Sequence, residues 1–424
     1  MSISNIFLAV ALFFSFSLWG DAFYERSPVD YEDGKEDNEV VRLQSKIDKG
    51  LKIEFDYKHG YLPGVLKALN ISQESQLLVF SKTSAHRRLI SPYNPRAIYF
   101  NKNSYVGWVN GAKFLELGVT DKNLGTVFYT LDQKKMGKPR FERDDTCLSC
   151  HASSRTDYEP GFLVRSIFPD KSGEIISRAG GEQVDHTTPI NLRWGGWFVT
   201  ADKFISPHRG NAVTVEKDND FSLKSIPAKT TVDLQQFLNP ENYLAKTSDV
   251  QALMVMEHQV KMQNILTSTK FRVMHALHNE RIINKALKEM GRRQMTSKII
   301  SNAATEVLDY MLFVDELNLK KISIKGTDSF LKSFKKESPK TTKGDSLTDF
   351  VFKNRISKYP CSWLIYCDSF IGLPIELKSE VLSRLKKILT EKEIDDKYIH
   401  LRQTRAQIHQ ILMETHKSYK ASQK

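Results

Sequence analysis

Cys147, Cys150 and His151 form a motif whose residue types and spacing predict a specific chemistry. Two thiols three residues apart lie on the same side of a helical turn, and the imidazole follows directly after the second thiol. This Cys-x-x-Cys-His pattern is the attachment sequence for c-type haem, in which the thiols add to the two vinyl groups of one porphyrin. The histidine is then placed against the iron as its proximal ligand. We therefore expect one covalently bound haem c.

Two other chemistries use paired cysteines, and the sequence favours neither. A structural zinc site needs two further ligands at suitable spacing, and the chain contains no second Cys-x-x-Cys pair. A thiol-redox pair is typical of a thioredoxin-like βαβ setting, whereas this pair follows predicted strands and the charged loop 140–145. Haem attachment therefore remains the prediction for this motif.

The residue that binds the opposite side of the iron is marked less clearly than the proximal histidine. The candidates are His186, His258 and His208, in that order. His258 lies between Met254 and Met262 on one face of a predicted helix, at intervals of four residues. Core filling is the more common use of Met at helical spacing, and a histidine there is more often a core or surface residue. If none of them binds, the sixth position of the iron stays open to a small ligand.

A second dense cluster contains Arg193, Trp194 and Trp197, with two glycines between the tryptophans. The glycines let a bulky group approach the backbone, the indole rings supply apolar contact, and the arginine can pair with a haem propionate. This combination predicts one wall of the haem pocket. The alternative is a β-turn with tryptophans in the core. Arg143 and Arg165 are weaker propionate candidates.

The sequence pattern around these residues predicts an α+β fold. Its first part is a β-rich and loop-rich haem-binding domain over residues 51–235. Short β-branched and aromatic runs alternate there with Pro, Asn and Gly, which is typical of strands in a mostly antiparallel sheet. The predicted strands are residues 76–81, 97–100, 104–109, 125–130, 161–168 and 196–200.

The remainder of the chain, residues 240–424, is predicted to be mainly helical. Residues 241–292 contain one Gly and no Pro, and their apolar side chains recur at helical spacing, which predicts one long helix or two in succession. Residues 296–320 and 373–419 have helical patterns too. A segment rich in Lys and Ser, residues 320–345, is predicted to be a solvated connector between them.

The N-terminus predicts export. Residues 6–18 form an almost uninterrupted apolar run, and Gly20 and Ala22 supply the small residues that signal peptidase reads. We therefore predict a signal peptide at residues 1–22 and a periplasmic protein, in agreement with haem attachment outside the cytoplasm. No Lys or Arg precedes the run, so an uncleaved inner-membrane anchor is the alternative. Residues 23–50 are predicted to be an acidic, solvated linker.

The composition limits the classes of protein and of partner. Of 424 residues, 40% are hydrophobic and 26% are charged, as in soluble globular proteins, and no internal apolar run suits a polytopic membrane protein. The net charge is +12, but no nucleic-acid-binding motif is present, so we expect no nucleic-acid partner. We expect the positive charge to steer an acidic redox partner, with peripheral membrane association as an alternative. The sequence identifies neither that partner nor an oligomeric state.

The sequence resembles the exported single-haem cytochrome c domain-containing proteins of Gram-negative bacteria. The segments that carry the resemblance are residues 80–84, 90–101, 105–108, 128–133, 144–151, 161–169, 186–200, 257–259 and 359–369. They cover most of the chain beyond residue 75, and the run around Cys-x-x-Cys-His is the most specific of them. The resemblance implies a haem protein bound through Cys147, Cys150 and His151, without a specific activity. Further positions of the family motifs are His186, Arg193, Trp194 and Trp197.

Cys361 and Cys367 stand six residues apart in an apolar segment. In an oxidising compartment they can form a disulfide, and the apolar surroundings suit two buried thiols equally well. In the family that the sequence resembles, the position of Cys367 is often Ser, which counts against an obligatory disulfide.

Two functions are compatible with a single haem. The first, which we favour, is a one-electron carrier rather than an enzyme. The second is a haem oxidoreductase or sensor whose open sixth position receives peroxide, a nitrogen oxide or a similar small ligand. The chain is longer than one haem requires, which weighs against a simple carrier, and its single motif weighs against a two-haem peroxidase. A third class is an interaction protein in which the helical part binds a partner. No catalytic residue is assigned.

Overall fold

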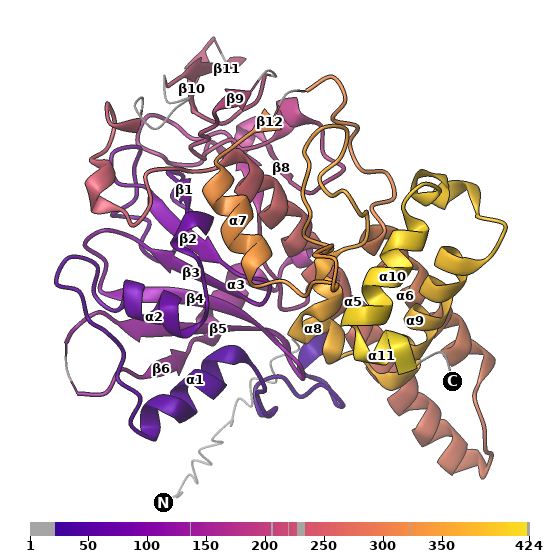
Figure 1. The fold of residues 1–424 in the computed structure, drawn as a ribbon. Helices are drawn as coiled ribbons and strands as arrows, with labels where there is room; N and C mark the ends of the chain where they lie inside the picture. Colours follow the sequence, from indigo (N-terminus) through magenta and orange to yellow (C-terminus); the bar gives the residue numbers. More distant parts are fainter. Residues whose placement is uncertain are drawn as a thin grey trace, which may run out of the picture.

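The computed structural model describes residues 22–135, 137–204, 207–218, 220–226, 234–322 and 324–421. Helices account for 40% of the structure and antiparallel strands for 16%, which confirms the predicted mixed α+β class. The predicted signal peptide at residues 1–22 lies outside the described residues, apart from Ala22. Figure 1 shows the main sheet on one side of the molecule and the C-terminal helices on the other.

The main sheet has six antiparallel strands that follow one another in sequence order. Its strands are β1 (Leu77–Val79), β2 (Arg96–Phe100), β3 (Ser104–Trp108), β4 (Phe114–Asp121), β5 (Gly125–Asp132) and β6 (Phe141–Arg143). Each strand pairs with its neighbours in the sequence. Short turns connect β2 to β3, β3 to β4 and β4 to β5, whereas the longer segment 80–95 connects β1 to β2. The predictions for β1, β2, β3 and β5 are confirmed, whereas β4 and β6 were not predicted.

In the described part of the chain, three two-stranded ribbons lie outside this sheet. They are β7 (Arg165–Ile167) with β8 (Gly181–Gln183), β9 (Lys203–Phe204) with β12 (Ile324–Lys325), and β10 (Ala212–Lys217) with β11 (Asp220–Ser225). The strand predicted at residues 196–200 is instead an irregular segment that makes isolated bridges, including one between Val79 and Trp197.

One helix is much longer than the others: α5 (Val250–Leu287) runs for 38 residues, so the segment predicted as one or two helices is a single helix. It begins at Asp249, whose side chain accepts hydrogen bonds from the backbone N–H groups of Gln251 and Ala252. The other α-helices in the described part are α1 (Glu39–Asp48), α2 (Leu62–Ala68), α3 (Leu148–His151), α6 (Gln294–Met311), α7 (Asp328–Lys336), α8 (Asp368–Ile371), α9 (Ile375–Thr390), α10 (Arg405–Thr415) and α11 (Lys417–Ala421).

The two faces of the main sheet are buried in different cores, because successive side chains of a strand point to opposite faces. Tyr99 of β2 belongs to the core that includes Leu43 of α1 and Leu66 of α2. The next residue, Phe100, belongs to the core that includes Leu266 of α5. The sheet is therefore covered by α1 and α2 on one face and by α5 on the other.

Residues 23–50 differ from the predicted linker, because most of this segment folds onto the sheet. α1 buries Val40, Leu43 and Ile47, whose spacing gives the helix one apolar face. Asn38 caps the helix through its side-chain oxygen, which accepts two backbone hydrogen bonds. The acidic composition led to the linker prediction. The carboxylates, however, lie outside the apolar face of the helix and have polar partners of their own.

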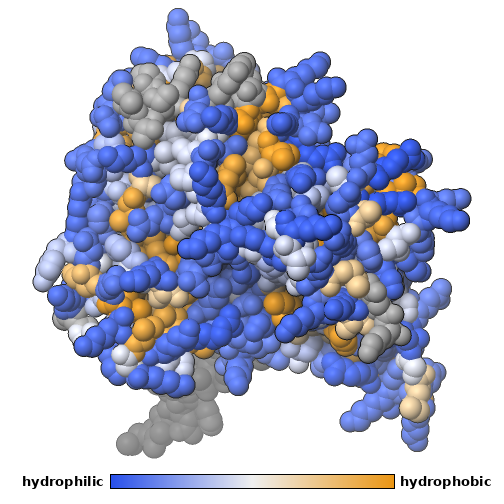
Figure 2. Space-filling model, in the orientation of Figure 1, coloured by the Kyte–Doolittle hydropathy of each residue, from blue (hydrophilic) through white to orange (hydrophobic). Residues whose placement is uncertain are grey.

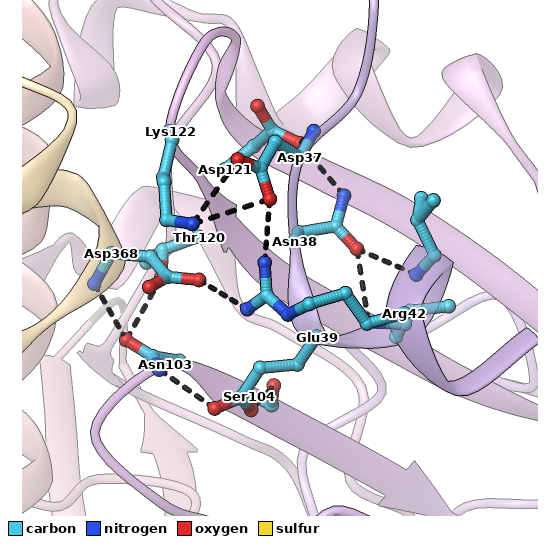
Figure 3. A network of polar contacts seen from close by, with 12 residues as sticks. Asp37, Asn38, Glu39, Arg42, Asn103, Ser104, Thr120, Asp121, Lys122 and Asp368 are labelled. Carbon is cyan, nitrogen blue, oxygen red and sulfur yellow. Dashed lines mark hydrogen bonds and ion pairs between the residues drawn. The ribbon is translucent and has the colours of Figure 1, made fainter. Parts of the chain in front are cut away.

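Those partners form a polar network that joins distant parts of the chain (Figure 3). Arg42 lies between Asp37 and Asp368. Its Nη1 atom is 2.6 Å from a carboxylate oxygen of Asp37, and its Nη2 atom is 2.6 Å from a carboxylate oxygen of Asp368. The backbone N–H of Asp368 donates to the side-chain oxygen of Asn103 at 2.9 Å. Lys122, at the turn between β4 and β5, pairs with Asp37 at 3.1 Å. The network thus connects α1, the sheet and α8.

The segment 320–345 differs from the predicted connector, since it contains β12 and α7. Phe330 is fully buried, and its ring lies 6.2 Å from the ring of Phe100. Phe334, one helical turn later, lies 6.0 Å from the same ring. The connector prediction relied on the many lysines and serines. The segment nevertheless forms an amphipathic helix, because its aromatic residues repeat at an interval of four.

The apolar core on the α5 face spans both predicted parts of the chain. It includes Leu77 of β1 and Leu412 of α10. Cys361 and Cys367 lie in the same core as two free, buried thiols, so this structure contains no disulfide between them. Among the helices of the described residues, none combines the length and the apolar character needed to cross a lipid bilayer.

Candidate functional site

The Cys-x-x-Cys-His motif lies directly after the main sheet, in a short 3₁₀ helix (Asp145–Cys147) followed by α3. Asp144 begins this turn, because its side chain accepts a hydrogen bond from the backbone N–H of Thr146. Cys147 is partly buried, Cys150 is exposed, and both are free thiols. Burial, together with the nearby Asp144 carboxylate, raises the pKa of the Cys147 thiol to about 12. This thiol is therefore protonated at neutral pH.

The imidazole of His151 is oriented by the backbone. Its Nδ1 atom lies 2.8 Å from the carbonyl oxygen of Gly161, and the Gly161 N–H donates to the His151 carbonyl at 2.9 Å. Because a carbonyl can only accept, Nδ1 carries the hydrogen in this bond. Burial lowers the pKa of His151, which favours the neutral ring, and Nε2 then presents a lone pair. Histidines that bind metals are oriented in this way.

The sheet and α5 together support this imidazole. The ring of His151 lies 4.5 Å from the ring of Phe128 on β5. Asn264 of α5 holds the adjoining backbone, because its side chain accepts from the Phe162 N–H and donates to the Phe162 carbonyl, both at 2.9 Å. Phe162 itself lies so close to Gly118 that a Cβ atom there would be 2.8 Å from its ring. The long helix thus positions the loop that orients His151.

Two arginines near the motif differ in whether they have anionic partners. Arg143, a propionate candidate, already pairs with Asp145 at 2.9 Å and with Glu36 at 3.3 Å. For the half-buried Arg165, in contrast, none of the carboxylates in the described ranges is a partner. Burial and the nearby Arg155 lower the pKa of Arg165. An anion bound between Arg155 and Arg165 would offset both the burial of Arg165 and its repulsion by Arg155.

The predicted pocket wall is divided between two environments. Arg193 is fully buried, and its Nη1 lies 2.7 Å from a carboxylate oxygen of the equally buried Glu257 on α5. Burial raises the pKa of Glu257, and the charge of Arg193 opposes this shift. Trp194 is buried beside this pair in a left-handed backbone conformation, with φ of 68°. Trp197 lies in a different environment, since its indole N–H donates to the carbonyl of Arg165 on β7 at 2.9 Å.

His186 and His258 lie together in the core, which we call the histidine pair. Their Nδ1 atoms are 2.6 Å apart, so one ring donates to the other. The Nε2 atom of His258 lies 2.8 Å from the hydroxyl oxygen of Ser362. Both rings stack with Tyr310 and Phe313, and burial lowers the pKa of both histidines.

The candidate residues therefore form two groups. Beside the sheet, Cys150 is exposed and Cys147 and His151 are partly buried, whereas the histidine pair and Arg193 form a fully buried cluster with Glu257. The remaining candidate, His208, has its ring 5.3 Å from that of Trp194 and so adjoins the buried cluster. None of the contacts described for His151 involves these other histidines.

Sequence reasoning missed the residues that hold these groups in place. Gly161 acts through its backbone carbonyl, which no side-chain pattern reveals. Asn264 and Ser362 lie more than 100 positions from their partners Phe162 and His258, so only the fold brings them together. Glu257, in contrast, adjoins His258 in the sequence, and a carboxylate on that predicted helix was a usable signal.

Comparison with known proteins adds no assignment. No family model, curated protein or solved structure matches the chain. Within the described ranges, no group of three or more His, Cys, Asp and Glu side chains is arranged to hold a metal ion. A haem iron places a smaller demand on the protein, since the porphyrin supplies four nitrogens and the chain one or two axial ligands.

Proposed function

We propose that this protein is an exported c-type cytochrome that carries one haem attached to Cys147 and Cys150, with His151 as the proximal ligand. The observation that carries the proposal is the 2.8 Å hydrogen bond between Nδ1 of His151 and the carbonyl of Gly161, because it leaves Nε2 to bind iron. Two free thiols adjoin this imidazole in the order and spacing that haem attachment requires. The donor set therefore fits the group.

In this proposal the β-rich part, residues 51–235, binds the haem, and the helical part, residues 240–424, supports it through α5. A bound haem supplies reversible one-electron transfer at its iron. Two thioethers to the cysteines would keep the haem bound, and the Gly161 carbonyl would fix the orientation of the imidazole. Arg155 and Arg165 would supply positive charge for the propionates. The N-terminal apolar run directs export to the periplasm, and the net charge of +12 steers an acidic redox partner.

A second candidate function is a haem enzyme or sensor with an open sixth position. The placement of the histidine pair favours this second function. Both rings are buried, hydrogen-bonded to each other, and stacked against the rings of Tyr310 and Phe313. Met254 and Met262 are buried in the core as well. Either histidine could reach the iron only if this packing were dismantled, so a small ligand would meet the free side of the haem.

Mass spectrometry and the reduced pyridine haemochrome spectrum test haem attachment. The full chain is produced in a host that attaches c-type haem, and we expect the protein mass to increase by that of one haem. The double variant Cys147→Ser/Cys150→Ser should lose all covalent haem. The matched control Cys361→Ser/Cys367→Ser changes the two other thiols and should keep it. Bare apoprotein mass in the wild type contradicts the proposal.

Carbon monoxide separates the two candidate functions. Rapid binding of carbon monoxide to the reduced wild-type protein indicates an open sixth position and rejects the simple carrier, whereas an unchanged spectrum indicates a strong sixth ligand. His151→Ala should abolish the wild-type spectrum while its two thiols still permit partial attachment. An unchanged spectrum in this variant would exclude His151 as the ligand.

A further inference from the structure

The end of α5 and the start of α6 form a projecting tip, which we define as residues 281–298. Figure 1 shows the end of the long helix extending away from the body of the molecule at the lower right. The two helices are connected by the short segment 288–293. No role in the proposed haem site involves this tip, because Asn264 lies 23 residues before the end of α5, which is about 35 Å along a helix.

Apolar side chains are concentrated on this tip. Met290 is 99% exposed, and Met295 is 68% exposed. Three more large apolar residues of the tip are at least 41% exposed: Ile282, Ile283 and Leu287. Figure 2 shows a pale, weakly hydrophobic area among hydrophilic residues on the projection. Five large exposed apolar residues within one short segment are unusual for a surface that contacts only water.

The tip is a built structure rather than a frayed helix end. The side-chain amide of Asn284 donates to the carbonyl of Gly291 at 2.8 Å and accepts from the guanidinium of Arg293 at 2.7 Å. The backbone N–H of Arg293 donates to Glu280 at 2.7 Å. Lys288 ends α5 in the left-handed conformation that terminates helices. Met290 is therefore held outward by a fixed turn.

Positive charge surrounds the apolar side chains. Within the tip, six residues are Lys or Arg and one, Glu289, is acidic. Arg292 and Arg293 have carboxylate partners. In the described part of the chain, no carboxylate pairs with the four others, which are Arg281, Lys285, Lys288 and Lys298. The tip thus presents cations without a carboxylate partner and exposed apolar groups together, at the end of α5, in the connecting segment and at the start of α6.

We propose that the tip docks this protein onto the surface of an anionic lipid bilayer, with Leu287 and Met290 entering the interface. A narrow projection with apolar residues at its end and cations around them matches a flat, deformable surface. The cations match acidic headgroups, to which each Lys or Arg near the surface adds attraction. A protein partner for a projection of this shape would need a groove with acidic walls, whereas a bilayer needs no prior fit. The proposal is independent of the haem.

Co-sedimentation with vesicles tests this docking on the full chain. We expect wild-type protein to bind vesicles of phosphatidylglycerol and phosphatidylethanolamine, and to bind phosphatidylcholine vesicles much less. Leu287→Asp/Met290→Asp should weaken binding to the anionic vesicles about tenfold or more, since two apolar groups no longer leave water. The matched control is Leu51→Asp, at a residue that is 44% exposed outside the tip, and its binding should not change.

Charge and local protection provide the second half of the test. Lys285→Gln/Lys288→Gln should lower binding at low salt by about fivefold per charge removed. Hydrogen exchange of residues 284–295 should slow when anionic vesicles are added, which locates the contact even if another segment also binds lipid. Equal vesicle binding by wild type and Leu287→Asp/Met290→Asp overturns the proposal. Loss of self-association in that variant, with vesicle binding unchanged, would instead assign the tip to a second copy of the chain.

Discussion

The hydrogen on Nδ1 of His151 determines which nitrogen of this side chain can bind a metal. Because its acceptor is the Gly161 carbonyl, the backbone determines the tautomer and no side-chain substitution at the acceptor can alter it. The sequence identifies His151 as the candidate ligand because it directly follows Cys150 in the motif. It could not predict the orienting carbonyl, since a backbone group has no sequence signature.

Lys270 shows at the same scale how burial changes a charged residue. It lies on α5 with 3% of its surface exposed, and its ammonium group donates to the backbone carbonyl of Lys122. Burial lowers its pKa to about 7, with Lys378 adding to this shift and Asp121 opposing it. Between pH 7 and the ordinary lysine value of 10.5, the unfolded chain retains a proton that the folded chain has released. The free energy of unfolding therefore rises with pH in this range.

We predict that the stability of the wild type relative to Lys270→Met increases by up to about 1.4 kcal/mol per pH unit above pH 7. Urea unfolding at pH 6, 7, 8 and 9 measures the difference, which should level off below pH 7. Lys387→Met, at an exposed lysine on α9, serves as the control and should show no such slope. A difference that stays constant across the series would mean that Lys270 keeps its proton in the folded protein.

At the scale of elements, α5 connects the separate parts of the structure. Through Asn264 it holds the loop beside His151, and through Gln259 and Gln263 it donates to the carbonyls of Asn101 and Lys102 at the turn between β2 and β3. The helix itself could be predicted, because 38 residues of helical spacing contain neither Gly nor Pro. Its polar contacts could not, since each joins residues that are distant in the sequence.

We predict that Asn264→Leu lowers the free energy of unfolding by about 1–3 kcal/mol, because the N–H and carbonyl of Phe162 lose their partners. Hydrogen exchange in residues 152–164 should accelerate as the loop loosens. Asn279→Leu changes an exposed asparagine on the same helix and should leave both measurements unaltered. If the two variants behave alike, α5 does not clamp the loop.

At the scale of the whole molecule, the segment before the sheet is part of the fold. The linker prediction for residues 23–50 relied on acidic composition, which does not distinguish free carboxylates from paired ones. Arg42 joins this segment to Asp368, 326 positions away, and Tyr31 is fully buried. Predictions from local pattern therefore succeeded for β1, β2, β3, β5 and the long helix α5, and did not succeed for α1 and α7, where polar residues surround a buried apolar face.

We predict that Leu43→Ala costs about 2–5 kcal/mol of stability, because Leu43 is 3% exposed in the core beneath the sheet. A solvated linker would tolerate the change, with an effect within about 0.5 kcal/mol. Leu51→Ala, at a half-exposed leucine, provides the comparison and should have a small effect. Guanidinium unfolding of both variants measures the difference, and equal midpoints would restore the linker interpretation.

The separation of Phe162 and Asn264 by 102 positions has a consequence for biosynthesis. At a translation rate of roughly 5–20 residues per second, the ribosome needs about 5–20 s to travel from one to the other. Throughout this interval the nascent polypeptide already carries both thiols and the imidazole but lacks the clamp that immobilises them. The loop beside the motif therefore becomes rigid only after α5 has been synthesised and has folded against it.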